Sequence, residues 1–340
     1  MTVLKFKDVG QGDSIFISWN EEDKVKIGII DCCKYAGRNP ILEEIQAIKS
    51  DFEIAFLVIS HGHQDHYSGI IELLNYCHYN GLIIQNVTST LNPCQVQFVN
   101  LNAERSERKA ISELLTSLKR FYKSGTIKET YPAYNNFTRF EIEDYILECL
   151  YPRHENYNIL ENNIDEYRRD NTKNLKNLNY ISTIFKLANQ SIYALLTSDC
   201  LTKSLNYIEK NDKDVQHKEL HLAQVPHHGS INNHNEKFWK NRKRIADCPS
   251  VISSGESQYN LPNREVVQSF SALGYKIYST NYVHGIKSYV ENRNATKDYS
   301  FIVNNFSDVS GEYSIKKPDR LVGDKVFHLK ETSIDYIPQN

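Results

Sequence analysis

Residues 60–69 read "SHGHQDHYSG" and follow directly after the apolar run "IAFLVI" of residues 54–59. A short, continuously apolar run of this kind is typical of a strand buried on both faces, so the polar cluster falls at the end of a strand. Side chains of an extended strand repeat with period two, and His61 and His63 therefore point to the same side. Neutral imidazoles and ionised carboxylates held close together are the ligands of hydrolytic metal sites. The stretch predicts half of a metal site rather than a polar loop rich in histidine.

Three further potential ligands follow other apolar runs. Asp199 comes directly after "YALLTS", and His227 and His228 come directly after "HLAQVP". A lone histidine is more often a surface or core residue than a ligand. Because the same residue types recur at the ends of several expected strands, the pattern favours a metal site over a histidine-rich loop.

The composition describes a chain that can fold alone. It has 340 residues, of which 40% are hydrophobic, and can bury a large core. The formal net charge is -2 and the isoelectric point about 6.6, so no global basic field indicates a nucleic-acid partner, although a local basic patch is compatible with these values. The seven cysteines show no CxxC spacing, which argues against a disulfide framework or a zinc ribbon.

Targeting signals are not evident in the sequence. The apolar runs are much shorter than the roughly 18 residues that a membrane helix needs. The N-terminal residues lack the basic start and the longer apolar segment of a secretory signal. We therefore expect a soluble, cytoplasmic protein without a membrane partner.

Apolar periodicity divides the chain into strands and helices. Strands are expected at residues 3–10, 14–19, 25–31, 53–60, 81–91, 138–152, 180–188, 191–199, 221–226, 250–255 and 275–281. Helices are expected at residues 39–50, 67–80, 103–125, 200–211, 233–247 and 263–274. Residues 155–179 are rich in asparagine and charge, and we expect a mobile loop or lid there. No repeat or long linker stands out, so the pattern predicts a single α/β domain over residues 1–340.

The motif "HGHQDH" resembles the HxHxDH signature of the metallo-β-lactamase-fold hydrolases. That resemblance implies a four-layer αββα sandwich with a two-metal site on one edge. Further segments resemble, in order, the soluble hydrolase domain of the ComEC/Rec2 DNA-uptake proteins. These are "DVGQGDSIFI", "IGIIDCC", "SHGHQDHYSG", "ISTIFKL", "LLTSDC", "VPHHGSINNH", "SVISSGESQYNLPNREVV" and "YSTNYVHG".

The match to the DNA-uptake hydrolase domain runs from about residue 5 to about residue 290. Residues 95–180 contain helical and loop insertions, and residues 300–340 are expected to be a C-terminal extension. The membrane channel of the uptake proteins has no counterpart here. The resemblance therefore implies their hydrolase domain standing by itself.

The resemblance implies a site for two divalent metal ions, zinc or manganese, that share an attacking hydroxide. It gives His61 and His63 to one ion, Asp65, His66 and His227 to the other, and Asp199 to both. Catalytic roles are implied for Asp65, Asp199 and His228, with His228 contacting a ligand or the substrate rather than a metal.

Residues around the ligands have expected supporting roles. Asp31, in "IIDCC", matches an aspartate that orients a ligand histidine by a hydrogen bond, which fixes the imidazole tautomer. Gln11 and Asp13, in "GQGD", are expected in a neighbouring loop, where they either support the site or only form the turn.

The sequence departs from the family pattern at a few positions. Ser198 stands where relatives carry glycine, and Leu261 and Tyr151 stand where polar or basic groups are expected. These changes bear on substrate handling rather than on metal binding. Many metallo-β-lactamase-fold enzymes bind the first metal with a further histidine. In this sequence His154 alone lies near the corresponding position, and it either binds that metal or belongs to a surface loop.

A basic run, "KFWKNRKR", occupies residues 237–244 just beyond "HHGS". The candidate contacts to a substrate phosphate are Ser230, Lys240, Arg242, Lys243 and Arg244. Alternatively, the basic residues of this run form the solvent-exposed face of a helix and contact no substrate.

Three functions remain open at this point. The first is a metal-dependent phosphodiesterase or nuclease acting on DNA or RNA, in DNA processing or phage defence. The second is a hydrolase of a small molecule such as a nucleotide messenger or a lactone, favoured by the near-neutral charge. The third is a non-catalytic interaction subunit that keeps a metal for stability. Protein partners encoded in the same operon are also expected, and the sequence does not indicate an oligomeric state.

Overall fold

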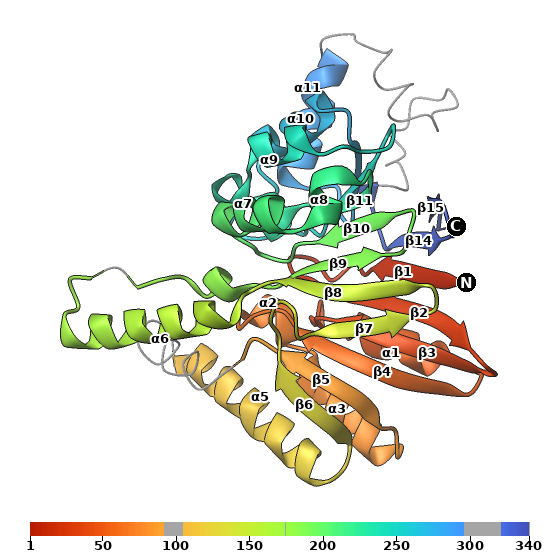
Figure 1. Ribbon diagram of the computed structural model, residues 1–340, viewed down its shortest axis with the longest axis vertical. Coiled ribbons are helices and arrows are strands. Elements are labelled where there is room, and N and C mark those ends of the chain that lie inside the picture. The colour runs from red at the N-terminus through yellow and green to blue at the C-terminus, as the bar shows by residue number, and fades with distance from the viewer. Residues whose placement is uncertain (92–104, 174, 296–320, 340) are drawn as a thin grey trace.

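The computed structural model describes residues 1–91, 105–173, 175–295 and 321–339, which form two large β-sheets (Figure 1). The first sheet has eight strands in the order β15-β14-β1-β2-β3-β4-β5-β6. Its strands are β1 (Thr2–Phe6), β2 (Ile15–Glu21), β3 (Lys24–Ile30), β4 (Phe52–Ile59), β5 (Ile84–Ser89), β6 (Ile127–Pro132), β14 (Lys325–Leu329) and β15 (Ile334–Ile337).

The second sheet has seven strands in the order β13-β12-β11-β10-β9-β8-β7. Its strands are β7 (Arg139–Ile142), β8 (Tyr145–Tyr151), β9 (Ile184–Ala188), β10 (Tyr193–Leu196), β11 (Leu220–Gln224), β12 (Pro249–Ile252) and β13 (Lys276–Ser279). Strands β9 and β10, which fall within two successive expected strands, pair antiparallel and form a hairpin.

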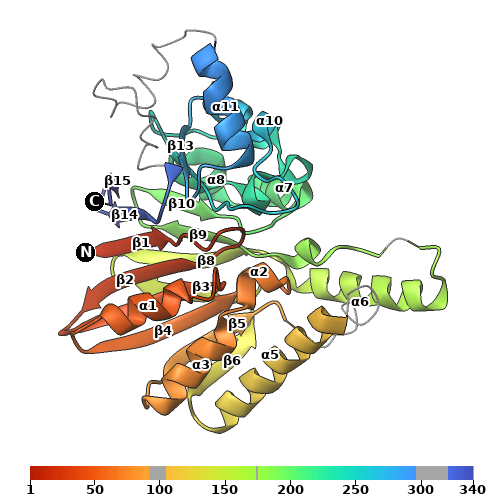
Figure 2. The ribbon, with the colours of Figure 1, turned by 180° about the vertical axis from the view of Figure 1, so that it is seen from behind.

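Helices cover the outer face of each sheet (Figure 2). The first sheet carries α1 (Pro40–Ala47), α3 (Ile70–Tyr79) and α5 (Arg105–Lys123), and the second carries α7 (Thr202–Asn211), α8 (Lys213–His217), α9 (Glu236–Asn241), α10 (Arg264–Ala272) and α11 (His284–Ala295). One apolar cluster fills the space between the sheets, and another lies under each helical layer. The predicted four-layer αββα sandwich, the architecture of the metallo-β-lactamase fold, is confirmed.

Strand β4 shows why the apolar run before the histidine cluster is continuous. Phe56 and Val58 point into the core between the sheets, whereas Leu57 and Ile59 point into the core under the helices. Phe56 stacks on Phe140 of the second sheet with ring centroids 4.1 Å apart. The strand is therefore buried on both faces, as its sequence predicts.

Parallel pairing brings the site-bearing strand ends together. In the first sheet β3 pairs parallel with β4, and in the second sheet β10 pairs parallel with β11 and β11 with β12. The carboxyl ends of these strands therefore lie at one edge of the sandwich. A hydrogen bond from the Ser198 hydroxyl to the Ser60 hydroxyl, 2.9 Å long, joins the two sheets there.

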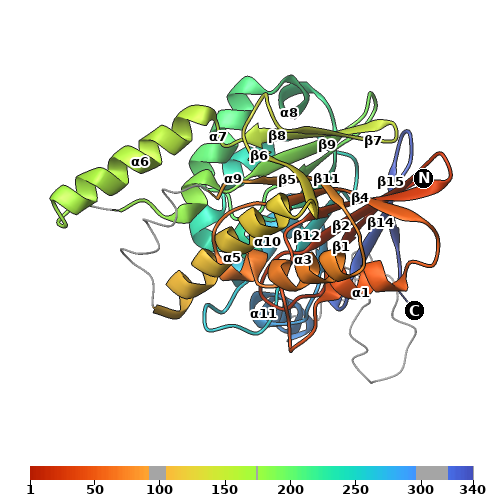
Figure 3. The same ribbon diagram turned by 90° about the horizontal axis from the view of Figure 1, so that it is seen from below.

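The expectation of a mobile loop over residues 155–179 is wrong for most of that segment. Helix α6 (His154–Arg169) occupies it and projects away from the two sheets (Figures 1 and 3). The Asn156 side chain caps the helix by accepting a hydrogen bond from the amide of Arg153. Leu160 and Ile164 lie four residues apart on one face and pack in a small separate cluster. The polar composition concealed this apolar spacing.

The expected C-terminal extension is, in its described part, integral to the first sheet. Strand β14 pairs antiparallel with β1, and β15 pairs with β14. Phe327 of β14 is fully buried and packs against Phe6 and Tyr278, with ring centroids 6.2 and 5.5 Å away. Residues 300–320 and 340 of the extension lie outside the described residues.

Within the described residues, none of the helices combines the length and the apolar character needed to cross a bilayer.

Because Phe327 joins the C-terminal strands to the core, Phe327→Ala should lower the free energy of unfolding by about 3–5 kcal/mol, the usual cost of a buried phenylalanine. Urea denaturation followed by far-ultraviolet circular dichroism measures this change. Tyr79→Ala, at a site that is 83% exposed, is the control and should change stability little. Equal effects of the two substitutions would contradict a structural role for the C-terminal strands.

Candidate metal centre

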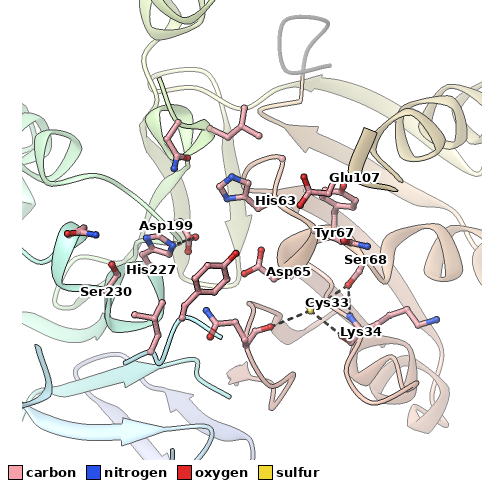
Figure 4. A pocket seen from close by; sticks show the side chains of 18 of the residues that line it. Cys33, Lys34, His63, Asp65, Tyr67, Ser68, Glu107, Asp199, His227 and Ser230 are labelled. Atoms are coloured by element: carbon pink, nitrogen blue, oxygen red, sulfur yellow. Dashed lines mark hydrogen bonds and ion pairs between the residues drawn. The ribbon is translucent and has the colours of Figure 1, made fainter. Parts of the chain in front are cut away.

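A pocket of about 940 Å³ lies at the edge where the carboxyl ends of both sheets meet (Figure 4). Five of the residues predicted for the site line it directly together with Gln11, namely His63, Asp65, Asp199, His227 and Ser230. They come from segments more than 200 residues apart in the sequence, so the pocket is a product of the fold of both sheets.

His61 and His63 lie in the bend between β4 and the short helix α2 (Gln64–Tyr67), not on the extended strand. Their rings nevertheless meet, with Nε2 of His61 3.0 Å from Nδ1 of His63. Burial lowers the pKa of both imidazoles, so both are neutral at physiological pH. The neutral imidazole is the form that binds a metal.

Asp31 holds His66 in place. Oδ2 of Asp31 lies 2.7 Å from Nδ1 of His66, and the same carboxylate accepts hydrogen bonds from the amide (2.7 Å) and the hydroxyl (2.6 Å) of Ser60. This is the contact that the family resemblance implied for Asp31. With Nδ1 engaged, Nε2 of His66 faces the carboxylate of Asp199 at 3.5 Å.

Asp199 lies at the centre of the cluster and is 1% exposed. Four imidazole Nε2 atoms surround its carboxylate, those of His61 (3.6 Å), His66 (3.5 Å), His227 (3.3 Å) and His228 (3.5 Å). Burial alone would raise the pKa of Asp199, but His227, His66 and His228 outweigh it and hold that pKa well below its usual range. The carboxylate is therefore ionised and faces ligand atoms on both sides.

The two adjacent histidines are placed differently from the expectation. His228, not His227, joins Asp65 and His66, with its Nε2 3.4 Å from Oδ2 of Asp65. His227 faces the other oxygen of Asp199, the one that His61 also faces. Both residues adopt left-handed backbone angles, with φ of 50° and 53°. This turn presents both rings to Asp199, so His228 occupies the position beside Asp65 and His66 that was expected for His227.

Neighbouring acceptors fix the orientation of both rings. Nδ1 of His228 lies 3.0 Å from the carbonyl oxygen of Ser253, and Nδ1 of His227 lies 2.8 Å from Oδ1 of Asn233. The Asn233 amide donates to the carbonyls of Asp199 and Cys200, which sets the direction of its oxygen. In each ring Nδ1 is therefore the donor and Nε2 is left to act as a ligand.

These orienting residues were missed by the sequence reasoning. Ser60 immediately precedes "HGHQDH", and Asn233 lies within "HHGSINNH", so both stood inside segments already singled out. Ser253 acts through its backbone carbonyl, for which a sequence carries no signal.

The serine that replaces the family glycine occupies a strained position. Ser198 has a φ of 43°, in the left-handed region that favours glycine. Its hydroxyl donates to the hydroxyl of Ser60, which in turn donates to Asp31. The side chain that causes the strain thus also links the second sheet to the Asp31–His66 pair.

Within the described residues, several buried atoms that could act as metal ligands have no hydrogen-bond partner. They are Oδ1 of Asp13, Nε2 of His66, Oδ1 of Asp199 and Nε2 of His228. Ligand atoms of Asp65, His66 and His228 lie within 4.8 Å of one another, as do those of His61, His66 and Asp199. Unpaired buried polar atoms cost free energy, and a divalent cation among imidazoles and carboxylates satisfies them. The residues therefore fit metal ions.

The electrostatic environment of His228 supports the same conclusion. Burial lowers its pKa, but Asp199 and Asp65 outweigh the burial and raise that pKa to about 9. The carboxylates thus create a field that stabilises positive charge at this point. A proton and a metal ion compete for such a position.

The "GQGD" turn contacts segments that carry candidate ligands. Asp13 is buried, and its carboxylate accepts a hydrogen bond of 2.8 Å from Gln224, whose own oxygen accepts from the amides at the end of β10. Gly12 has a φ of 138°, and a Cβ there would lie 2.4 Å from the carbonyl oxygen of Asp65. Gln11 lines the pocket. The turn therefore packs directly on the ligand segment.

The basic run does not reach the pocket. Arg242 is 5% exposed, and its guanidinium contacts Glu209 (2.5 Å) and the carbonyls of Phe238 and Val215. Arg244 donates to the carbonyls of Arg242 and Leu273. Lys240 and Lys243 are exposed but do not line the pocket. The expected phosphate contact is wrong for the two arginines, because both guanidiniums are used inside the fold.

Leu261, Tyr151 and His154, the other positions noted in the sequence, lie in three different environments. Leu261 lines the pocket, whereas Tyr151 is buried in the second sheet and donates to the carbonyl of Tyr180. His154 begins α6, is exposed and contacts Tyr134. It belongs to none of the metal-type clusters of the described residues.

No family model matches the chain, and no curated protein sequence matches it. Solved structures do show similarity. The chain is similar to the metallo-β-lactamase-fold protein YhfI from Bacillus subtilis, at 9% identity and a TM-score of 0.42, over 82% of this chain and 96% of that one. It is similar to Zn²⁺-bound PqqB from Methylobacterium extorquens at 10% identity and a TM-score of 0.44, over 82% and 98%.

A diphosphatase of the PhnP family is similar at 11% identity and a TM-score of 0.35, over 84% of this chain and 86% of that one. At TM-scores below 0.5 these similarities carry no argument about activity, and the identities give no support to the closer resemblance to ComEC/Rec2. The metallo-β-lactamase type of fold rests on the sheets and layers of this chain itself.

The strain at Ser198 leads to a testable difference between two substitutions. Ser198→Ala keeps the left-handed strain and loses the hydrogen bond to Ser60, and should cost about 1 kcal/mol of unfolding free energy. Ser198→Gly loses the same bond but relieves roughly 1 kcal/mol of strain, and should stay near the parent protein. Urea denaturation of metal-stripped protein measures both. An alanine variant as stable as the glycine variant would show that the strain is absent.

Proposed function

We propose that the chain is a metal-dependent hydrolase that uses two divalent ions, zinc or manganese. The observation that carries this proposal is the convergence of buried ligand atoms of His66, His228 and Asp199, which have no hydrogen-bond partner within the described residues, beside a pocket that Asp199 lines. Buried polar atoms of native proteins are nearly always paired, so such a cluster marks a ligand site.

Two ligand sets are proposed from the distances. His61, His63 and His227 form one set, and Asp65, His66 and His228 form the other. Asp199 turns one carboxylate oxygen to each set and is shared by both. This assignment keeps the predicted ligands and adds His228, which takes the place foreseen for His227.

Divalent ions at this position supply Lewis-acid polarisation of the substrate and lower the pKa of water. The protein orients its ligands through Asp31, Asn233 and the carbonyl of Ser253. Ser230 lines the pocket beside His227, and its hydroxyl has no hydrogen-bond partner among the described residues. That hydroxyl can donate to a substrate oxygen. Asp65, one third exposed, lines the pocket, and its carboxylate lies 3.4 Å from Nε2 of His228.

A phosphodiester is the proposed substrate type. The sequence resemblance to a DNA-uptake hydrolase domain supports this proposal, and acceptor oxygens of a phosphodiester suit the free Ser230 hydroxyl. Support from the basic run is lost, since Arg242 and Arg244 are engaged inside the fold. A role in DNA processing or phage defence, a cytoplasmic location and operon-encoded partners stay predictions.

Hydrolysis of a small molecule is the second candidate, and the pocket itself favours it. Among the described residues that line it, Lys34 is the single lysine or arginine, and its ammonium lies 3.1 Å from Glu72. A polynucleotide track requires several phosphate contacts from such cations. The pocket volume of about 940 Å³ is within the range of small-molecule sites.

Metal stoichiometry tests the two ligand sets. The purified protein should contain about two divalent ions per chain. Asp65→Ala and His228→Ala should each leave about one, and their double variant should lose no more, because both residues serve one ion. Combining His61→Ala with His228→Ala should remove both ions, and Asp199→Ala should lose most of both. Elemental mass spectrometry after desalting measures the content.

His154→Ala is the matched control and should keep the full metal content, because His154 is exposed and belongs to none of the metal-type clusters of the described residues. Circular dichroism establishes that each variant is folded. If His228→Ala keeps both ions while His227→Ala loses the ion held with Asp65, then His227 is the ligand beside Asp65, as the family resemblance implied. The assignment of His228 to that ion would then be wrong.

Activity separates the three candidate functions. Metal-loaded protein should hydrolyse bis(p-nitrophenyl) phosphate, and Ser230→Ala should lower kcat/KM by about 10-fold or more, the loss of one hydrogen bond to a charged group. Single-stranded and double-stranded DNA and RNA should be tested from neutral to alkaline pH. Uncut nucleic acids exclude the nuclease. Lactone opening without phosphodiester hydrolysis would favour the second candidate, and full metal content without any hydrolysis would favour the interaction subunit.

A further inference from the structure

One wall of the pocket is apolar and carries an exposed aromatic ring. Tyr259 and Ile231 line this wall and are 66% and 47% exposed, and Leu261 lies beside them. The other tyrosine that lines the pocket, Tyr67, is 5% exposed and packed into the helical core. A ring at a pocket wall gains apolar contact when a ligand covers it.

Hydrogen bonds hold this wall together as one unit. The amide of Asn263 donates to the carbonyl of Gly229 (2.9 Å), and Oδ1 of Asn263 accepts from the amide of Ile231 (2.8 Å). These bonds join the segment that follows His228 to the loop that carries Tyr259. At the start of that loop a Cβ on Gly255 would lie 2.4 Å or less from the backbone of the "GQGD" turn. The wall is therefore fixed relative to the proposed metal ligands.

Polar groups without partners accompany the apolar wall. Asn232 and Asn263 line the pocket, and neither the side-chain amide of Asn232 nor Nδ2 of Asn263 has a hydrogen-bond partner within the part of the chain that the structure describes. The Asn232 carboxamide offers both a donor and an acceptor, and Nδ2 of Asn263 offers a donor. The combination of an exposed ring and free carboxamides is complementary to a planar heteroaromatic ring with polar edges, such as a nucleobase.

The charges of the pocket limit the length of such a ligand. Lys34 is the single basic side chain of lysine or arginine type on the described walls, and Glu107 lines the wall near Tyr67 (Figure 4). A polymer bound by its backbone would need a longer row of cations. One phosphate held near Asp199 and His227, with one base on Tyr259, needs no such row.

We infer that the pocket binds a nucleotide-sized phosphodiester whose base stacks on Tyr259, with the phosphate directed toward the Asp199 cluster. The inference rests on the proposed function for the reaction, but the ring subsite itself concerns binding alone. Stacking of the nucleobase on the Tyr259 ring determines the affinity for the base, and Asn232 and Asn263 contact the polar edge of the base. Tyr259 is thus a residue of substrate specificity rather than of the chemical step.

Equilibrium binding isolates the ring subsite without any need for turnover. Isothermal titration of the purified protein with adenosine 5′-monophosphate and with ribose 5-phosphate compares two ligands that share the phosphate and differ in the base. The nucleotide should bind about 5- to 100-fold more tightly, the usual range for stacking on one aromatic side chain. Tyr259→Ser should reduce this preference to about twofold or less, whereas Tyr259→Phe should retain it.

Tyr79→Ser is the matched control, since Tyr79 is another exposed tyrosine but does not line the pocket, and it should leave the preference unchanged. Equal affinities of the two ligands for the parent protein, or an unchanged preference in Tyr259→Ser, would overturn the inference. A single-stranded oligonucleotide that binds far more tightly than the mononucleotide, with a steep salt dependence, would also overturn it in favour of a polymer. Loss of hydrolysis or of metal with the preference intact would instead count against the proposed function.

Discussion

A buried carboxylate surrounded by imidazoles is the constraint on which the site depends. Removing the charge of Asp199 from water is costly, and the cost is offset only where opposite charge or hydrogen bonds are close. Four imidazole nitrogens lie within 3.6 Å of it, two on each side. Each imidazole is in turn oriented by a neighbour, as His66 is by Asp31 and His228 by Ser253. The surrounding loops can therefore be understood as supports for one ionised group.

The backbone around that group is strained in a consistent way. Four non-glycine residues that carry or orient ligand atoms have positive φ, between 43° and 61°: Asp31, Ser198, His227 and His228. Left-handed conformations of this kind cost roughly 1–3 kcal/mol each and persist where the surrounding structure fixes them. Hydrogen bonds across the two sheets do so here, because Ser60 contacts Asp31 from its own sheet and accepts a hydrogen bond from Ser198 of the other.

The pocket above the cluster differs from a nucleic-acid surface in its physical character. Its described walls include apolar side chains, asparagine carboxamides and a single lysine without any arginine, whereas a surface that binds nucleic acid through counterion release carries many such cations. The arginines that a sequence would assign to phosphate contact instead stabilise the outer helical layer, where Arg242 contacts Glu209 and Arg244 contacts a carbonyl of Leu273. The proposed metal ligands thus lie at the strand ends, and the proposed ring subsite lies on the loops after β11 and β12.

Apolar period and polar residues placed after buried strands are local properties, so the sequence by itself predicted an α/β domain and most participants of the metal-type cluster. The four-layer arrangement was implied by the resemblance of the "HGHQDH" motif to the metallo-β-lactamase-fold hydrolases. The sequence did not determine which of His227 and His228 faces Asp65, since that depends on a left-handed turn held by contacts to distant loops. Helix α6 escaped detection because its few apolar residues become informative only when Tyr180 and Ile181 pack against them. Likewise, the role of Arg242 follows from a partner 33 residues away, Glu209, and side chains distant in sequence meet only through the tertiary structure.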